Sequence, residues 1–110
     1  MQDRFLGFLG LLLKAGHVTF GDERVTTAVQ SGKGCLILLA NDSAPRLVRR
    51  MEVLADEYTI KKHVLPYSKE QLGQAVGSAL CGTVCVTDVR TANAVIQKMQ
   101  KMKLMGGKIE

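Results

Sequence analysis

The fold of this chain is decided by residues 35–40, which read CLILLA. This run is apolar without interruption and has the length of a strand. A strand that is apolar on both sides is covered on both faces, which is typical of a sheet with helices on each side. The next residues, 41–45, read NDSAP, and proline is tolerated in the first turn of a helix. We therefore expect a buried strand that leads directly into a helix.

Outward from this strand, the hydrophobic period alternates between helical and extended. We expect helices over residues 5–13, 21–31, 45–58, 68–77 and 88–102, and strands over residues 17–20, 35–40, 62–66 and 83–87. Strands that alternate with helices build a sheet with a helical layer on each face. The sequence therefore predicts an α/β fold, a three-layer α/β/α sandwich around a mixed sheet of about four strands.

The chain has 110 residues, of which 46% are apolar. This length suits one domain with a core of its own. We treat residues 1–110 as a single α/β/α domain, with residues 103–110 as a frayed basic tail. No segment reaches the roughly 18 continuous apolar residues of a membrane helix, so we expect no membrane partner.

The apolar run at residues 5–13 has two interpretations. It resembles the core of a secretory signal peptide. However, Asp3 sits in the charged region, Lys14 follows the run, and no small-x-small cleavage site comes next. The apolar residues also fall at helical spacing, which is typical of a helix with one buried face. We prefer the retained helix.

The three cysteines are Cys35, Cys81 and Cys85, and all lie in apolar stretches. An odd count of this kind suits a reducing compartment better than a disulfide framework, so we expect a cytoplasmic protein. Cys81 and Cys85 resemble half of a metal site, but no second cysteine pair or histidine cluster completes it. We expect buried thiols, no metal and no cofactor.

Signatures of catalysis are sparse. Residues 31–34 read SGKG, which lacks the two spaced glycines and the following Ser or Thr of a phosphate-binding loop. His17 and His63 have no adjacent nucleophile in sequence. An enzyme would need a concave site that joins His63 or Cys85 to other polar groups in space. We assign no catalytic residues, and we rank an enzyme below the two binding functions considered at the end of this subsection.

The balance of charge points to a polyanionic partner. Fifteen lysines and arginines stand against ten aspartates and glutamates, which gives a formal charge of +5 and a pI of about 9.3. A basic domain attracts nucleic acid first and an anionic membrane second. Charge alone is a weak signal, because many proteins carry as much.

Two surface segments are candidates for the contact. Residues 20–27 begin a helix, where free backbone N–H groups bind phosphates. Asp22 and Glu23 repel phosphate, so the amino groups of bases are their expected partners. Residues 76–82 read VGSALCG, a loop of small residues in which an exposed Leu80 can pack against unstacked bases. The simpler interpretation is an ordinary helix cap and an ordinary turn, and the residues alone favour it.

A family resemblance covers most of the chain, these two segments included. Residues 36–45 are similar to an "IAxDAxP" segment, and residues 68–77, SKEQLGQAVG, match "SKxELGxAxG". Over residues 5–99 the chain resembles the ribosomal protein L-seven-Ae and L-thirty-e superfamily, most closely its bacterial YlxQ-type branch. The resemblance implies an α/β/α sandwich that binds kink-turns, which are sharply bent internal loops in RNA. A Gly-x-Asn-Glu-x-x-Lys motif and a hydrophobic loop would make the contacts.

Residue by residue, this motif falls on residues 21–27. Gly21 matches its glycine, Glu23 stands at the asparagine, Arg24 at the glutamate and Thr27 at the lysine. Arg24 donates where glutamate would accept, so its expected partners are guanine acceptors or a phosphate. The implied RNA face consists of Gly21, Asp22, Glu23, Arg24, Thr27, Gly77, Ser78, Ala79 and Leu80, with Lys33 reaching phosphates nearby.

The first functional hypothesis is therefore an RNA-binding protein that recognises structured, kink-turn-like RNA. Its expected partners are ribosomal RNA and the ribosome. The second hypothesis is a protein-interaction module on the same fold, which lost kink-turn recognition through the departures at Glu23, Arg24 and Thr27. The RNA target and the oligomeric state stay open at this point.

Overall fold

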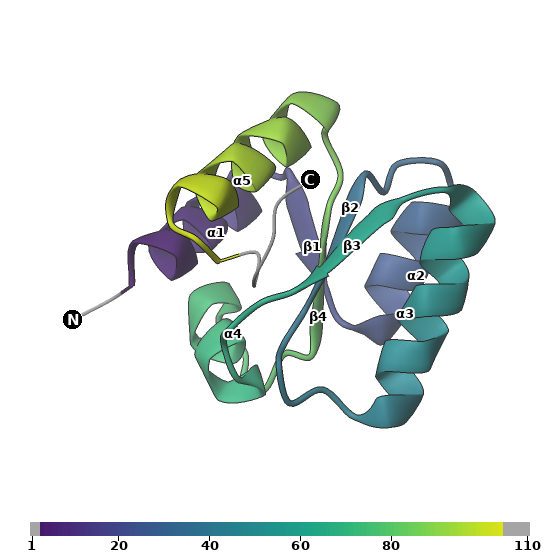
Figure 1. The fold of residues 1–110 in the computed structure, drawn as a ribbon, viewed down its shortest axis with the longest axis horizontal. Coiled ribbons are helices and arrows are strands. Elements are labelled where there is room, and N and C mark those ends of the chain that lie inside the picture. The colour runs from purple at the N-terminus through teal and green to yellow at the C-terminus, as the bar shows by residue number, and fades with distance from the viewer. Residues whose placement is uncertain (1–2, 105–110) are drawn as a thin grey trace.

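The computed structural model describes residues 3–104. Helices and strands follow one another in the predicted order (Figure 1). The helices are α1 (Arg4–Lys14), α2 (Asp22–Gln30), α3 (Pro45–Tyr58), α4 (Lys69–Val76) and α5 (Val89–Lys101), and the strands are β1 (Val18–Phe20), β2 (Leu36–Leu39), β3 (Lys61–Val64) and β4 (Thr83–Val86). Every predicted element is confirmed. The largest difference is at β3, which ends two residues before Pro66, a residue with no N–H for the ladder.

The four strands form one mixed sheet in the order β1-β4-β2-β3. β4 lies between β1 and β2 and runs antiparallel to both, whereas β2 and β3 are parallel. The last strand in the sequence is therefore an internal strand of the sheet. β1 and β3 are the two edges.

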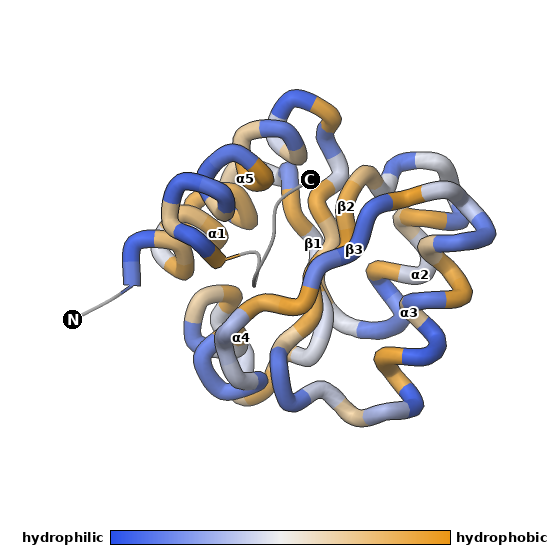
Figure 2. Tube along the Cα trace, in the orientation of Figure 1, coloured by the Kyte–Doolittle hydropathy of each residue, from blue (hydrophilic) through white to orange (hydrophobic). Residues whose placement is uncertain are grey.

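Helices cover both faces of the sheet, which confirms the three-layer sandwich. α2 and α3 lie on one face, and α1, α4 and α5 lie on the other (Figure 1). Along β2, Leu36 and Leu38 belong to the core under α1, α4 and α5, whereas Ile37 and Leu39 belong to the core under α2 and α3. Figure 2 shows β2 as continuously hydrophobic. The apolar run of β2 is uninterrupted because each face of the strand meets a different core.

The apolar run near the N-terminus forms α1, as the helical interpretation predicted. Phe5 and Leu9 of α1 are fully buried in the core. Asp3 caps the helix by accepting hydrogen bonds from the backbone N–H groups of Phe5 (2.7 Å) and Leu6 (3.3 Å). The Tyr67 hydroxyl donates to the same carboxylate at 2.8 Å. The cap thereby ties the start of α1 to the segment before α4.

The predicted basic tail, residues 103–110, lies largely outside the described residues, which end at Leu104. Leu104 itself packs against the core under α1, α4 and α5. Between residues 3 and 104, no helix combines the length and the apolar character that a membrane crossing requires.

Candidate nucleic-acid interface

The two candidate segments meet at one end of the sheet. Gly21 connects β1 to α2, and the loop of residues 77–82 leads into β4. The Gly21 N–H donates to the carbonyl of Thr83 at 3.1 Å, so the start of α2 lies directly beside the start of β4. Segments about 60 residues apart in sequence are thus joined by one backbone hydrogen bond.

Gly21 has a backbone that other residues adopt only with strain. Its φ is 94° and its ψ is 148°, a region that is essentially restricted to glycine. As the N-cap of α2 it supplies no side-chain hydrogen bond to the first turn. The N–H groups of that turn therefore have no side-chain cap, and a ligand can approach them closely.

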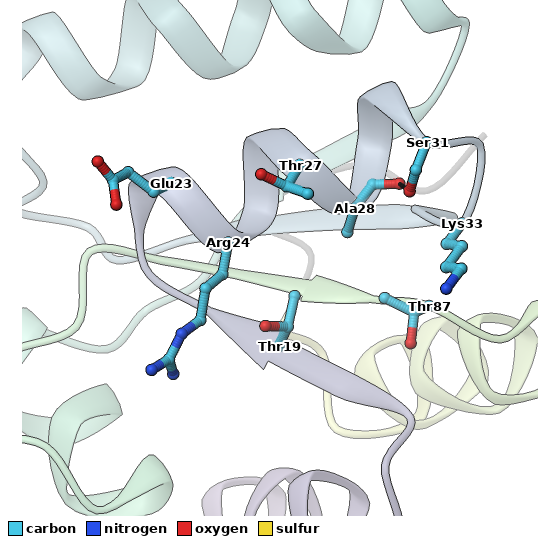
Figure 3. A pocket seen from close by; sticks show the side chains of 8 residues that line it. All are labelled: Thr19, Glu23, Arg24, Thr27, Ala28, Ser31, Lys33 and Thr87. Carbon is cyan, nitrogen blue, oxygen red and sulfur yellow. Dashed lines mark hydrogen bonds between the residues drawn. The ribbon is translucent and has the colours of Figure 1, made fainter.

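Arg24 is held against an aromatic ring. Its guanidinium lies over the ring of Phe20, 5.2 Å from the centroid. Such cation–π contacts stabilise exposed sites by about 0.5–1 kcal/mol. In Figure 3 the side chain extends from α2 toward the strand that carries Thr19. The contact orders the long Arg24 side chain before binding, so less side-chain conformational entropy is lost when a ligand binds.

A shallow depression of about 450 Å³ lies between α2 and the edge strand β1. Four of the predicted residues line it together with Thr19: these are Glu23, Arg24, Thr27 and Lys33 (Figure 3). Lys33 lies at the far end, because the nine residues of α2 separate it from the start of the helix. The structure thus brings Lys33 into the depression but not beside the loop of residues 77–82.

Asp22 faces a different part of the molecule. Its carboxylate forms an ion pair with Arg50 of α3 and accepts a hydrogen bond from the Thr26 hydroxyl at 3.5 Å. It is therefore partly neutralised and contacts α3, whereas the neighbouring Glu23 lines the depression. The structure separates these two carboxylates, which the sequence analysis had placed in one RNA face.

The loop after α4 is folded back on its own helix. Gly77 ends α4 with a φ of 78°, and the Ser78 N–H donates to the carbonyl of Gly73 at 2.8 Å. A Cβ atom on Gly73 would lie 2.6 Å from the Ser78 carbonyl oxygen, so only glycine permits this approach. Leu80 is 56% exposed at the tip, as its place in the small-residue loop suggested. Gly73 was missed, although a glycine inside a helix signals a close approach.

A third segment reaches the same end of the sheet, and the sequence analysis missed it. The Ala40 N–H donates to the carbonyl of Gly82 at 3.0 Å, and the Ser43 hydroxyl donates to the same oxygen at 2.7 Å. The chain that enters α3 is thereby attached to the loop of residues 77–82. No local pattern in the sequence predicts these bonds.

The structure does not bring the candidate catalytic groups together. Cys85 belongs to the core under α2 and α3, whereas His63 pairs with Leu38, whose side chain belongs to the other core. Burial raises the pKa of the Cys81 and Cys85 thiols to about 11, so both are protonated at neutral pH. The pKa of His63 is lowered, mainly by burial and to a lesser extent by the positive charges of the neighbouring lysines. Among residues 3–104, no three His, Cys, Asp or Glu residues are grouped as metal ligands require.

Comparison with protein families and known sequences gives a consistent result. The family model described as "Ribosomal protein L7Ae/L30e/S12e/Gadd45 family" matches residues 3–97. Large ribosomal subunit protein eL8 of Methanobrevibacter smithii is 32% identical over 95 residues, which cover 81% of this chain and 76% of that protein. Large ribosomal subunit protein eL8 of Cenarchaeum symbiosum is 29% identical over 87 residues, which cover 78% of this chain and 68% of that protein.

Solved structures show the same fold. A protein with unknown function from Bacillus halodurans superimposes with a TM-score of 0.73 at 28% identity, covering 86% of this chain and 97% of that one. The 15.5kD RNA binding protein of Giardia lamblia superimposes with a TM-score of 0.72 at 16% identity, covering 94% and 91%. The second likeness concerns the fold alone.

Proposed function

Because this chain belongs to the ribosomal protein L7Ae/L30e/S12e/Gadd45 family, we propose that it is an RNA-binding protein associated with the ribosome. The observation that carries the proposal is the hydrogen bond from Gly21 to Thr83, which brings the start of α2 beside the loop of residues 77–82. Two relatives are ribosomal proteins by name, and a protein of the same fold is an RNA-binding protein. A cytoplasmic location and a role without catalysis accompany this function.

The two parts of the site suit two features of a bent internal loop. At α2, the guanidinium of Arg24 offers donors to guanine O6 and N7 or to a phosphate, and Glu23 accepts from base amino groups. At the loop, the exposed Leu80 offers an apolar surface to a nucleotide that has left the stack. A plain duplex keeps its bases paired and stacked, so it offers no unstacked nucleotide to Leu80. The site therefore favours structured, kink-turn-like RNA, and ribosomal RNA is the expected source.

Arg24 gives this site a different chemistry from the motif of the wider family. Ordered by Phe20, it donates at a position where the motif has an acceptor, so the preferred base edge changes from a donor to an acceptor. Thr27 stands where the motif has lysine, so the next turn of α2 lacks the positive charge that the motif has there. We infer that this chain reads a variant of the kink-turn, and that it belongs to the YlxQ-type branch that the SKEQLGQAVG block at residues 68–77 indicates.

Fluorescence anisotropy with three labelled RNAs tests the proposal. These are a kink-turn, a scrambled internal loop and a plain duplex of equal length, each at two salt concentrations. We expect the kink-turn to bind most tightly, and Arg24→Ala to weaken it by about 1–3 kcal/mol, the worth of one good base contact. Arg90→Ala on α5 is the matched control, because it removes one exposed arginine from the opposite face of the sheet.

Equal affinity for the kink-turn and the duplex would contradict structured-RNA recognition. So would an Arg24→Ala protein that binds as well as Arg90→Ala. Absence of binding to all three RNAs at micromolar protein, together with a protein that co-purifies in stoichiometric amount, would support an interaction module instead.

A further inference from the structure

The other face of α2 borders a groove that carries three arginines. Arg46, Arg49 and Arg50 of α3 line this groove, which has a volume of about 640 Å³ and is closed on its other side by Thr26 of α2. Glu57 lines it as well, nearer the end of α3. We call this feature the arginine groove. It is distinct from the depression between α2 and β1.

The charges of α3 are placed against the helix dipole. The first turn has no acidic residue and contains Arg46, whereas the last turn has no basic residue and contains Asp56 and Glu57. Cations at a helix start and anions at its end both destabilise the helix. α5 has Asp88 as its N-cap and lysines in its last turn, although Arg90 lies in its first turn. Helix stability therefore does not explain the position of Arg46.

Two of the three arginines have no ion pair within residues 3–104. Arg50 is the exception, because it pairs with Asp22. Asp42, the acidic residue closest before α3, accepts a hydrogen bond from the backbone N–H of Lys69 at 2.8 Å. Arg46 and Arg49 are both exposed. Neither guanidinium group has an acidic partner among the described residues.

The arginine groove lies next to the start of α2, which belongs to the proposed RNA site. The ion pair between Arg50 and Asp22 connects it to the start of α2. At its other side, Ser43 attaches the start of α3 to Gly82 in the loop of residues 77–82. A strand of RNA seated at the start of α2 therefore reaches Arg46 and Arg49 along the first two turns of α3.

We propose that the arginine groove binds the phosphate backbone of the stem next to the recognised internal loop; this rests on the function proposed above. Arginine suits phosphate because its planar fork donates two parallel hydrogen bonds. The groove changes sign at Glu57, so the phosphate contacts end near Arg50. The stem contacts add affinity for any sequence, whereas the site at Arg24 supplies the discrimination.

The test compares two double variants on two RNAs. Arg46→Ala with Arg49→Ala removes two charges from the groove. Arg90→Ala with Lys101→Ala removes two charges from α5 and is the control; Arg90, like Arg46, is the second residue of its helix. One RNA carries the internal loop with a full stem, and the other has that stem shortened to the pairs that flank the loop. Binding is measured from low to high salt.

On the full stem, we expect the groove variant to lower the slope of log affinity against log salt by about two, one for each lost phosphate contact. A fourfold rise in salt then weakens its binding about 16-fold less than it weakens the wild type. On the short stem, the groove variant and the α5 variant should have equal slopes. Arg24→Ala should weaken both RNAs.

Equal slopes for the two double variants on the full stem would overturn the groove contact alone, provided that the wild type binds and depends on Arg24. An equal loss on the short and the full stem would overturn the assignment to the stem. Loss of a co-purifying protein with unchanged RNA binding would also overturn it. Failure of the wild type to bind either RNA would instead overturn the proposed function itself.

Discussion

Replacing Gly73 with alanine tests whether the loop geometry supports RNA binding. A Cβ atom there would lie 2.6 Å from the Ser78 carbonyl oxygen and 2.8 Å from that of Ala79. Both contacts are with backbone, so the loop must move by several tenths of an ångström. Alanine gains about 1 kcal/mol of helix propensity over glycine, whereas overpacking costs about 1–3 kcal/mol. We expect a net loss of about 1 kcal/mol in the free energy of unfolding.

Binding should suffer more than stability, because the displaced loop carries the exposed Leu80. Fully burying one leucine side chain is worth about 1.5–3 kcal/mol, so losing this contact with an unstacked base weakens an RNA complex by up to that amount. Urea unfolding and anisotropy with kink-turn RNA measure the two effects, and Gln74→Ala is the control because Gln74 is an exposed neighbour on α4. A Gly73→Ala protein that is more stable than the wild type and binds as tightly would refute the reasoning.

Two further predictions concern titratable groups. Burial alone would raise the pKa of Asp3, but hydrogen bonds from Tyr67 and from two amides of α1 lower it; its stabilising effect is therefore present above about pH 4 and is lost as the pH falls through the lowered pKa. Asp3→Ala should cost about 1 kcal/mol in urea unfolding at neutral pH and less in acid, and equal costs would contradict this. Burial raises the pKa values of the Cys81 and Cys85 thiols to about 11, so a thiol reagent near neutral pH should label both only after urea unfolds the chain. Mass spectrometry measures the labelling, and rapid labelling of the folded protein would contradict this prediction.

The arrangement of layers could be predicted because it depends on local hydrophobic period. The run at residues 36–39 is apolar at every position because its two faces meet two cores, and each helix shows the spacing of a single buried face. The strand order could not be predicted. β4 lies between β1 and β2, although both precede it by tens of residues. Such pairing depends on contacts between distant segments, which no local pattern records.

The candidate site was predicted only as separate segments. The helix start at Gly21 and the loop near Leu80 were singled out as separate candidates from the residues, and the family resemblance then favoured both. Their proximity depends on a backbone bond from Gly21 to Thr83. The contact of Arg24 with Phe20 spans the junction of a strand and a helix, where neither the helical nor the extended hydrophobic period predicts which side chains meet. The ion pair of Asp22 could not be predicted for the same reason: its partner, Arg50, is 28 residues away, on another helix.

The proposed site is attached to one short stretch, residues 81–83, at the start of an internal strand. The Cys81 N–H donates to the carbonyl of Lys69 in α4, and the carbonyls of Gly82 and Thr83 accept from the segments that enter α3 and α2. The Thr83 side chain is buried and donates to the carbonyl of Leu38 at 3.1 Å. Moving any of these segments would break bonds to residues 81–83, which lead into β4 in the interior of the sheet. The protein surface is therefore preorganised, so the cost of ordering on binding falls on the RNA.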